Sequence, residues 1–159
     1  MIDLGGNIGV LGQAPEGDAW PLGLRHPRQP ERPFAVVDVT AGAIATSGDY
    51  ERYFVHDGVR YSHIVDPRTG WPVPGMASVS VLAPDGMLSD ALSTTLFVLG
   101  SEAGCEAIAG VAGVAAVWVP APAPGAESEA LRAVVGGELA GRVRVAAGLE
   151  VDVCAGTIR

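Results

Sequence analysis

The feature that most constrains the fold is a change of hydrophobic periodicity at Pro84. Residues 77–83 (ASVSVLA) alternate with period two, which is typical of a β-strand. Residues 86–100 (GMLSDALSTTLFVLG) instead repeat leucines at helical spacing, and Gly100 is a natural C-terminal stop. These leucines are Leu88, Leu92, Leu96 and Leu99. The sequence therefore predicts a strand that is followed almost directly by a helix.

Short strands joined by turns are predicted before this point. Residues 1–12 indicate a strand, a glycine turn and a second strand, and residues 20–24 indicate a short strand inside a Pro/Gly/Arg-rich loop. Residues 34–48 are strand-like with a glycine break. Asp57-Gly58 is a strong hairpin signal between RYFVH and VRYSHIV, so His63 is expected to lie within an alternating strand.

The rest of the chain adds a short helix over residues 101–109 and a strand over 113–121. Residues 120–137 indicate a Pro/Ala loop that ends in a helical turn, and residues 141–153 are strand-like. The order of these elements predicts an α+β fold, with a mostly antiparallel sheet and a few packed helices.

The composition fits one ordinary domain and excludes some partners. The chain has 159 residues, 48% hydrophobic and 18% charged, which is enough to bury a core and argues against disorder. Its net charge of −8 argues against nucleic acid as a partner and suits a bound metal ion. No signal peptide precedes the first motif, and no apolar run approaches the roughly 20 residues that span a bilayer.

The two cysteines, Cys105 and Cys154, are far apart and match no metal or redox spacing. Buried free thiols are therefore expected.

Asp90 and Thr94 are four residues apart on the predicted helix, so their side chains lie on one face. A carboxylate and a hydroxyl one turn apart supply two hard oxygen ligands for Mg²⁺. The alternative is an aspartate near the helix N-terminus and a threonine bonded to a backbone carbonyl. Spacing alone favours this alternative.

Two glycine-containing segments are candidates for nucleotide binding. Gly5 and Gly6 form a tight turn whose backbone N–H groups could approach a pyrophosphate, although a plain hairpin turn is at least as compatible with the sequence. Thr46, Ser47, Gly48 and Asp49 gather polar groups at a strand end. They suit a ribose or phosphate, and equally a turn with side-chain caps.

His63 precedes a good β-turn, DPRTG, at residues 66–70. A lone histidine on a strand is usually structural, so its position does not by itself identify a catalytic group.

Four motifs in combination are more specific than any one of them. DLGGNIGVLG, AIATSGDYERYF, RYSHIVDPRTGWPV and SDALSTTLFVLG, in this order, resemble the ApbE-like flavin transferases. The resemblance implies an α+β protein that binds FAD and Mg²⁺. It also implies transfer of FMN from FAD to a threonine or serine of a target flavoprotein, with release of AMP. Some relatives instead hydrolyse FAD to FMN and AMP.

The resemblance also implies roles for individual residues. Asp90 and Thr94 would ligate Mg²⁺, and His63 would act as general base on the incoming hydroxyl. Gly5, Gly6 and the segment from Thr46 to Asp49 would shape the FAD pocket. Some members carry a further aspartate three residues before the metal aspartate, where this chain has Met87.

The family's amino-terminal half supplies much of its FAD pocket, and this chain matches the carboxy-terminal half. We therefore expect residues 1–159 to be one truncated, carboxy-terminal portion, inactive alone, that needs the other half or self-associates. Both an enzyme and a non-catalytic flavin- or metal-binding remnant remain open. The resemblance implies work at the outer face of the cytoplasmic membrane or in the periplasm.

Overall fold

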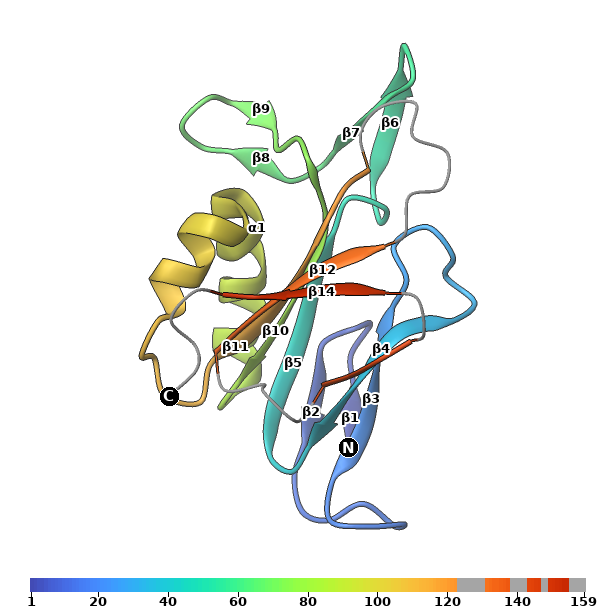
Figure 1. The fold of residues 1–159 in the computed structure, drawn as a ribbon, viewed down its shortest axis with the longest axis vertical. Coiled ribbons are helices and arrows are strands. Elements are labelled where there is room, and N and C mark those ends of the chain that lie inside the picture. The colour runs from blue at the N-terminus through green and yellow to red at the C-terminus, as the bar shows by residue number, and fades with distance from the viewer. Residues whose placement is uncertain (123–130, 138–142, 147–148, 155–159) are drawn as a thin grey trace.

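The computed structural model describes residues 1–122, 131–137, 143–146 and 149–154, and it is built around one large sheet (Figure 1). Its neighbouring strands are antiparallel, except for the last two, which are parallel. In spatial order the strands are β1 (Ile2–Asp3), β2 (Ile8–Val10), β5 (Gly42–Gly48), β10 (Met76–Ala83), β11 (Ala115–Pro120), β12 (Arg132–Gly137) and β14 (Glu150–Val153).

Each face of this sheet is covered by a different layer. One face packs against a three-stranded antiparallel sheet in the order β13 (Val143–Val145), β4 (Pro33–Val39) and β3 (Trp20–Arg25). The other packs against α1 (Gly86–Ile108). All eight residues of β10 are buried because this central strand has a hydrophobic core on both sides. The predicted α+β class with a mostly antiparallel sheet is confirmed.

The predicted strand–helix junction is also confirmed. The Asp85 carboxylate caps α1 by accepting a hydrogen bond from the Leu88 N–H at 2.9 Å. Gly100 interrupts the helix with φ 78° and ψ 177°, so residues 86–99 and 101–108 are two helical segments. No helix in the described residues is long and apolar enough to span a bilayer.

Two small hairpins lie at one end of the molecule, and Figure 1 shows both near the top of the view. The first joins β6 (Tyr53–His56) to β7 (Val59–Ser62), and the second joins β8 (Val65–Asp66) to β9 (Trp71–Pro72). Asp57 and Gly58 have φ of 49° and 74°, as a type I′ turn requires. The expectation that His63 lies within a strand is wrong, because β7 ends at Ser62 and the chain bends there towards β8.

The helical turn expected at the end of residues 120–137 is wrong. Residues 132–137 form β12 instead of a helical turn, because they pair with β11 in the sheet. Residues 123–130 of the same predicted loop lie outside the described residues.

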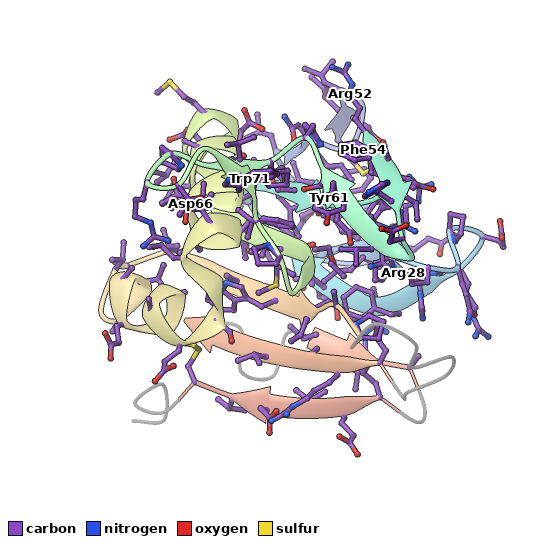
Figure 2. All side chains as sticks on the ribbon, turned by 90° about the horizontal axis from the view of Figure 1, so that it is seen from above. Arg28, Arg52, Phe54, Tyr61, Asp66 and Trp71 are labelled. Carbon is purple, nitrogen blue, oxygen red and sulfur yellow. A yellow bond between two sulfur atoms is a disulfide. The ribbon has the colours of Figure 1, made fainter. Side chains whose placement is uncertain are left out.

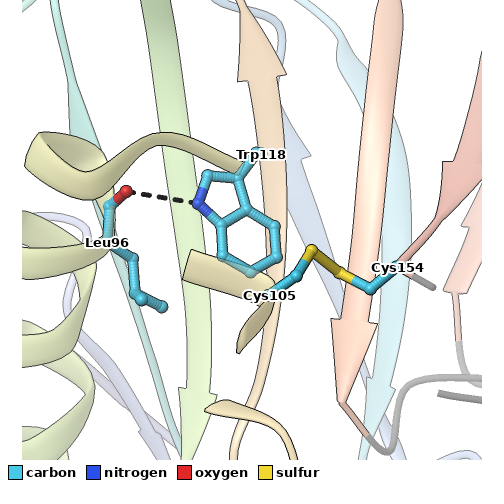
Figure 3. The surroundings of a disulfide bond; sticks show 4 residues. All are labelled: Leu96, Cys105, Trp118 and Cys154. Carbon is cyan, nitrogen blue, oxygen red and sulfur yellow. Dashed lines mark hydrogen bonds between the residues drawn. A yellow bond between two sulfur atoms is a disulfide. The ribbon is translucent and has the colours of Figure 1, made fainter. Parts of the chain in front are cut away.

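Cys105 and Cys154 are joined in a disulfide and are not free thiols (Figure 3). Strand β14 runs parallel to β12 and brings Cys154 beside α1, where the two Cα atoms are 5.7 Å apart. That separation is within the usual range for a disulfide.

Candidate functional site

The glycine turn between β1 and β2 places the side chain of Asn7 against α1. Gly5 and Gly6 have φ of 70° and 98°, which only glycine adopts readily. The Leu4 N–H donates to the Asn7 carbonyl at 3.0 Å, and the Gly6 N–H donates to Asp3 Oδ1 at 2.9 Å. This closed turn places Asn7 where its amide Nδ2 donates to Asp90 Oδ1 at 3.1 Å.

Asp90 is exposed and lies beyond the first turn of α1, which Asp85 caps. Its carboxylate therefore does not cap the helix. Thr94, also exposed, does not take the backbone partner expected of a helical threonine in the described residues. Its Oγ1 lies 3.0 Å from Ser47 Oγ, whereas the neighbouring Thr95 donates to the Ala91 carbonyl. The alternative of a threonine bonded to a backbone carbonyl therefore does not describe the contacts of Thr94.

Ser47 lies on β5 and faces α1, since it pairs with Val79, a residue of the helix-side core. Its Oγ lies 2.8 Å from the Oγ of Ser93, which is buried. The Asn7 amide, the Ser47 hydroxyl of β5, and the Asp90 carboxylate and two hydroxyls of α1 thus form one hydrogen-bonded cluster. Asn7 and Ser93 belong to this group although they were not among the predicted site residues. Asn7 lies in the motif DLGGNIGVLG, and Ser93 lies in SDALSTTLFVLG immediately before Thr94.

The other predicted pocket residues have different surroundings. Thr46 faces the opposite side of the sheet from Ser47, and its Oγ1 lies 2.8 Å from Ser80 Oγ. The Asp49 carboxylate is buried and accepts from both terminal nitrogens of Arg28, at 2.6 and 2.7 Å. Gly48 leaves no room for a side chain, because an added Cβ would lie 2.5 Å from the Tyr50 ring. Of this segment, only Ser47 bonds to the metal-site candidates.

His63 is exposed, and both its backbone and its ring contact the carbonyl of Arg52. Its backbone N–H donates to the Arg52 carbonyl at 2.9 Å, and its ring Nδ1 lies 3.2 Å from the same oxygen. A carbonyl only accepts, so this contact requires a proton on Nδ1. In the neutral ring, Nε2 then carries the free lone pair. The next residue, Ile64, anchors this segment in the core between the sheet and α1.

The turn after His63 is closed by local hydrogen bonds, and Figure 2 shows it over the helix side of the molecule. The Asp66 carbonyl accepts from the Gly70 N–H at 2.8 Å, and its carboxylate accepts from the Arg68 guanidinium. The hydrogen bonds from Arg68 hold the pKa of the Asp66 carboxyl below its usual range. Trp71, just after the turn, is 70% exposed.

The oxygen donors fit a magnesium ion better than a softer metal. The described residues contain no cluster of three histidine, cysteine or acidic side chains of the kind that holds zinc. Mg²⁺ in contrast is often held by one or two protein oxygens, with water and phosphate completing its shell. Asp90 and Thr94 present such oxygens at the surface, while Met87 is 83% exposed and adds no oxygen.

Residues 1–118 match the sequence model of the ApbE family. This chain belongs to the ApbE family. It is 42% identical over 129 residues to the FAD:protein FMN transferase of Treponema pallidum, covering 75% of this chain and 36% of that protein. Curated relatives from Haemophilus influenzae and other bacteria carry the same name.

Solved structures of the family have the same fold. The ApbE protein of Thermotoga maritima matches with a TM-score of 0.66 and 39% identity, over 73% of this chain and 38% of that one. The flavin transferase ApbE of Vibrio cholerae matches with a TM-score of 0.66 and 28% identity, over 87% of this chain and 42% of that one. The chain thus spans about a third of the length of the curated relatives it matches.

Proposed function

We propose that this chain carries the metal-binding face and the general base of an FAD:protein FMN transferase. The reaction transfers FMN from FAD to a threonine or serine hydroxyl of a target flavoprotein and releases AMP. The observation that carries the proposal is the convergence of Asp90, Thr94, Ser47 and Asn7, which come from three motifs far apart in the sequence. The transferase names of its relatives support the same reaction.

Asp90 and Thr94 would hold Mg²⁺ through one carboxylate oxygen and one hydroxyl oxygen. When bound, the ion would neutralise charge that develops on the pyrophosphate oxygens. Gly5, Gly6, Ser47 and the backbone of Gly48 would border the FAD phosphates. Asp49 and Thr46 would shape the pocket indirectly, through β5 and the loop that Arg28 anchors.

His63 would accept the proton of the incoming hydroxyl. Its Nδ1 contact with the Arg52 carbonyl leaves Nε2 free for this role. The hydroxyl oxygen then bonds to the phosphorus on the FMN side of the pyrophosphate. The bond from that phosphorus to the bridging oxygen breaks, AMP leaves with the electron pair, and the proton remains on His63.

Residues 1–159 are proposed to act as a single portion of an ApbE-like domain. Two alternatives have different products. An FAD pyrophosphatase would transfer FMN to water and give free FMN and AMP. A non-catalytic flavin- or metal-binding module would release neither product.

The test combines the chain with the amino-terminal half of an ApbE-family transferase, and incubates this completed protein with FAD, Mg²⁺ and a flavin-accepting target protein. The proposal expects target protein that carries covalent FMN, seen by mass and by flavin fluorescence in a denaturing gel, together with AMP. AMP and free FMN without labelled target would indicate the pyrophosphatase, and no AMP would indicate the binding module. Asp18→Asn is a matched control for changes at Asp90, since Asp18 is also an exposed aspartate bonded to a side-chain amide.

A further inference from the structure

The three hydroxyls at the site form a chain whose direction follows from counting protons. Ser93 Oγ donates to the Asp90 backbone carbonyl at 2.9 Å, and a carbonyl has no proton to give. Each serine has one hydroxyl proton. Ser93 must therefore accept from Ser47, at 2.8 Å.

The same count of hydroxyl protons fixes the direction in which Thr94 donates. Because the Ser47 proton points to Ser93, the 3.0 Å contact between Ser47 and Thr94 needs a proton from Thr94. The direction is thus from Thr94 to Ser47 to Ser93 to the Asp90 carbonyl. With its proton held against β5, Thr94 Oγ1 accepts no hydrogen bond from the described residues. Its lone pairs are left for a cation.

Asn7 restrains the Asp90 carboxylate in the same way that Ser47 restrains the Thr94 hydroxyl. Its amide N–H fixes Asp90 Oδ1 at 3.1 Å, and Oδ2 accepts no hydrogen bond in the part of the chain that the structure describes. Asn7 itself is held by its carbonyl, which accepts from Leu4 across the glycine turn. One oxygen of the Asp90 carboxylate is therefore held by a residue 83 positions away in the sequence.

We propose that Ser47 and Asn7 are positioning residues that prepare Thr94 and Asp90 to bind the metal ion. Ser47 aims the Thr94 hydroxyl proton away from the ion, and Asn7 sets the orientation of the Asp90 carboxylate. The inference rests on the proposed function, because it takes these two residues as metal ligands. Groups that orient metal ligands commonly change metal affinity by 10–100-fold when they are removed.

A purely structural role is separable from this one. The hydroxyl pair of Thr46 and Ser80 lies on the opposite face of the same two strands, with the same 2.8 Å separation. Ser80→Ala therefore removes an equivalent hydrogen bond from the sheet without touching the site. Gln13 likewise donates from its amide to Asp18 at 3.0 Å, which matches the contact from Asn7 to Asp90.

The experiment measures binding of Mn²⁺ alone to the full chain, by the loss of the free-ion signal in electron paramagnetic resonance. Ser47→Ala and Asn7→Ala should each weaken Mn²⁺ binding by about 10-fold or more. Ser47→Thr keeps the hydroxyl and should restore most of the affinity. Ser80→Ala and Gln13→Ala should bind as the unchanged chain does, and thermal unfolding of every variant controls for folding.

Three outcomes would overturn the inference, and they are distinguishable from one another. Equal losses in Ser47→Ala and Ser80→Ala would mean that the hydroxyls serve the sheet. Unchanged affinity in both Ser47→Ala and Asn7→Ala, with binding lost in Asp90→Ala, would refute positioning but keep the metal site. No Mn²⁺ binding by the unchanged chain would refute the metal site itself, and positioning with it.

Discussion

The two halves of α1 differ in what they contact, although Gly100 alone separates them. In residues 86–99, Asp90 and Thr94 are exposed and reach across to the glycine turn and β5 through polar side chains. In residues 101–108, Cys105 is bonded to Cys154 of the last described segment. An added Cβ at Gly104 would lie 2.7 Å from the Trp118 ring, so this half packs tightly on β11.

Trp118 connects the halves. Its indole Nε1 donates to the Leu96 carbonyl in the first half at 3.2 Å, and Figure 3 shows its ring between that carbonyl and the disulfide. The difference suggests a division in which the first half carries the chemistry and the second fixes the helix to the sheet. Changes in the first half should then alter metal binding, and changes in the second should alter the free energy of unfolding.

The largest expected effect is that of Asp90→Ala. Loss of the carboxylate removes a charged metal ligand, which contributes several kcal/mol of transition-state stabilisation, so Mg²⁺-dependent FMN transfer should fall to background. Because Asp90 is exposed, the free energy of unfolding should change by no more than about 0.5 kcal/mol. Transfer assays on the chain completed with the amino-terminal half of an ApbE-family transferase, and urea denaturation of the chain itself, measure the two. If Asp90→Ala still transfers FMN, Asp90 is not an essential metal ligand, and the first half of the helix does not carry the chemistry.

His63 tests whether the chemistry extends beyond α1. His63→Asn removes the proposed base and should lower the transfer rate by about 10²–10⁴-fold, with FAD affinity little changed. The matched control is His56→Asn, since His56 is also an exposed histidine, at the end of β6 in the hairpin that precedes His63. A parallel fall in transfer rate and thermal stability would instead assign His63 a structural role.

In the second half of the helix, the disulfide is expected to act on stability alone. Replacing Cys105 and Cys154 with serine removes a disulfide that closes a loop of 49 residues. The free energy of unfolding should fall by about 4 kcal/mol, because the unfolded chain regains the entropy of that loop. Urea denaturation of the oxidised chain and of the double variant measures the difference. Mn²⁺ affinity should be unchanged, and an equal loss of affinity would show that the two halves are coupled.

The sequence predicted local structure well because the signals are local. The periodicity change at Pro84 located β10 and α1, and Gly100 marked the break between the helical segments. Asp57-Gly58 identified the β6–β7 hairpin for the same reason: two positive φ angles are needed there, and the sequence supplies them.

Contacts between distant segments were not predictable in this way. The disulfide depends on β14 lying parallel to β12, a pairing that no spacing of Cys105 and Cys154 reveals. Asn7 reaches Asp90 only because β2 lies beside β5 in the sheet. The roles of Asp90, Thr94 and His63 stay predictions, because they depend on ligands that a sequence pattern does not locate.

A smaller effect on the free energy of unfolding is expected at Gly100, which separates the two halves of α1. Gly100 combines a positive φ with an extended ψ, a conformation nearly exclusive to glycine, so Gly100→Ala should cost about 1–3 kcal/mol of unfolding free energy. Gly9→Ala is the control, because Gly9 has no positive φ and an added Cβ there would meet no other atom within 4 Å. Similar costs for both would show that the helix break at Gly100 is not required.

The smallest effect is expected at the start of the first half. Asp85→Ala removes the N-cap bond to Leu88 and should lower the free energy of unfolding by about 1 kcal/mol. Asp85→Asn keeps a capping acceptor and should retain most of it. Hydrogen exchange should accelerate at the Leu88 and Ser89 amides, whereas Mn²⁺ affinity should hold, since Asn7 and Ser47 fix Asp90 and Thr94 from the sheet side. If affinity instead falls as far as in Ser47→Ala, the ligands are positioned by the helix end and not by β5 and the glycine turn.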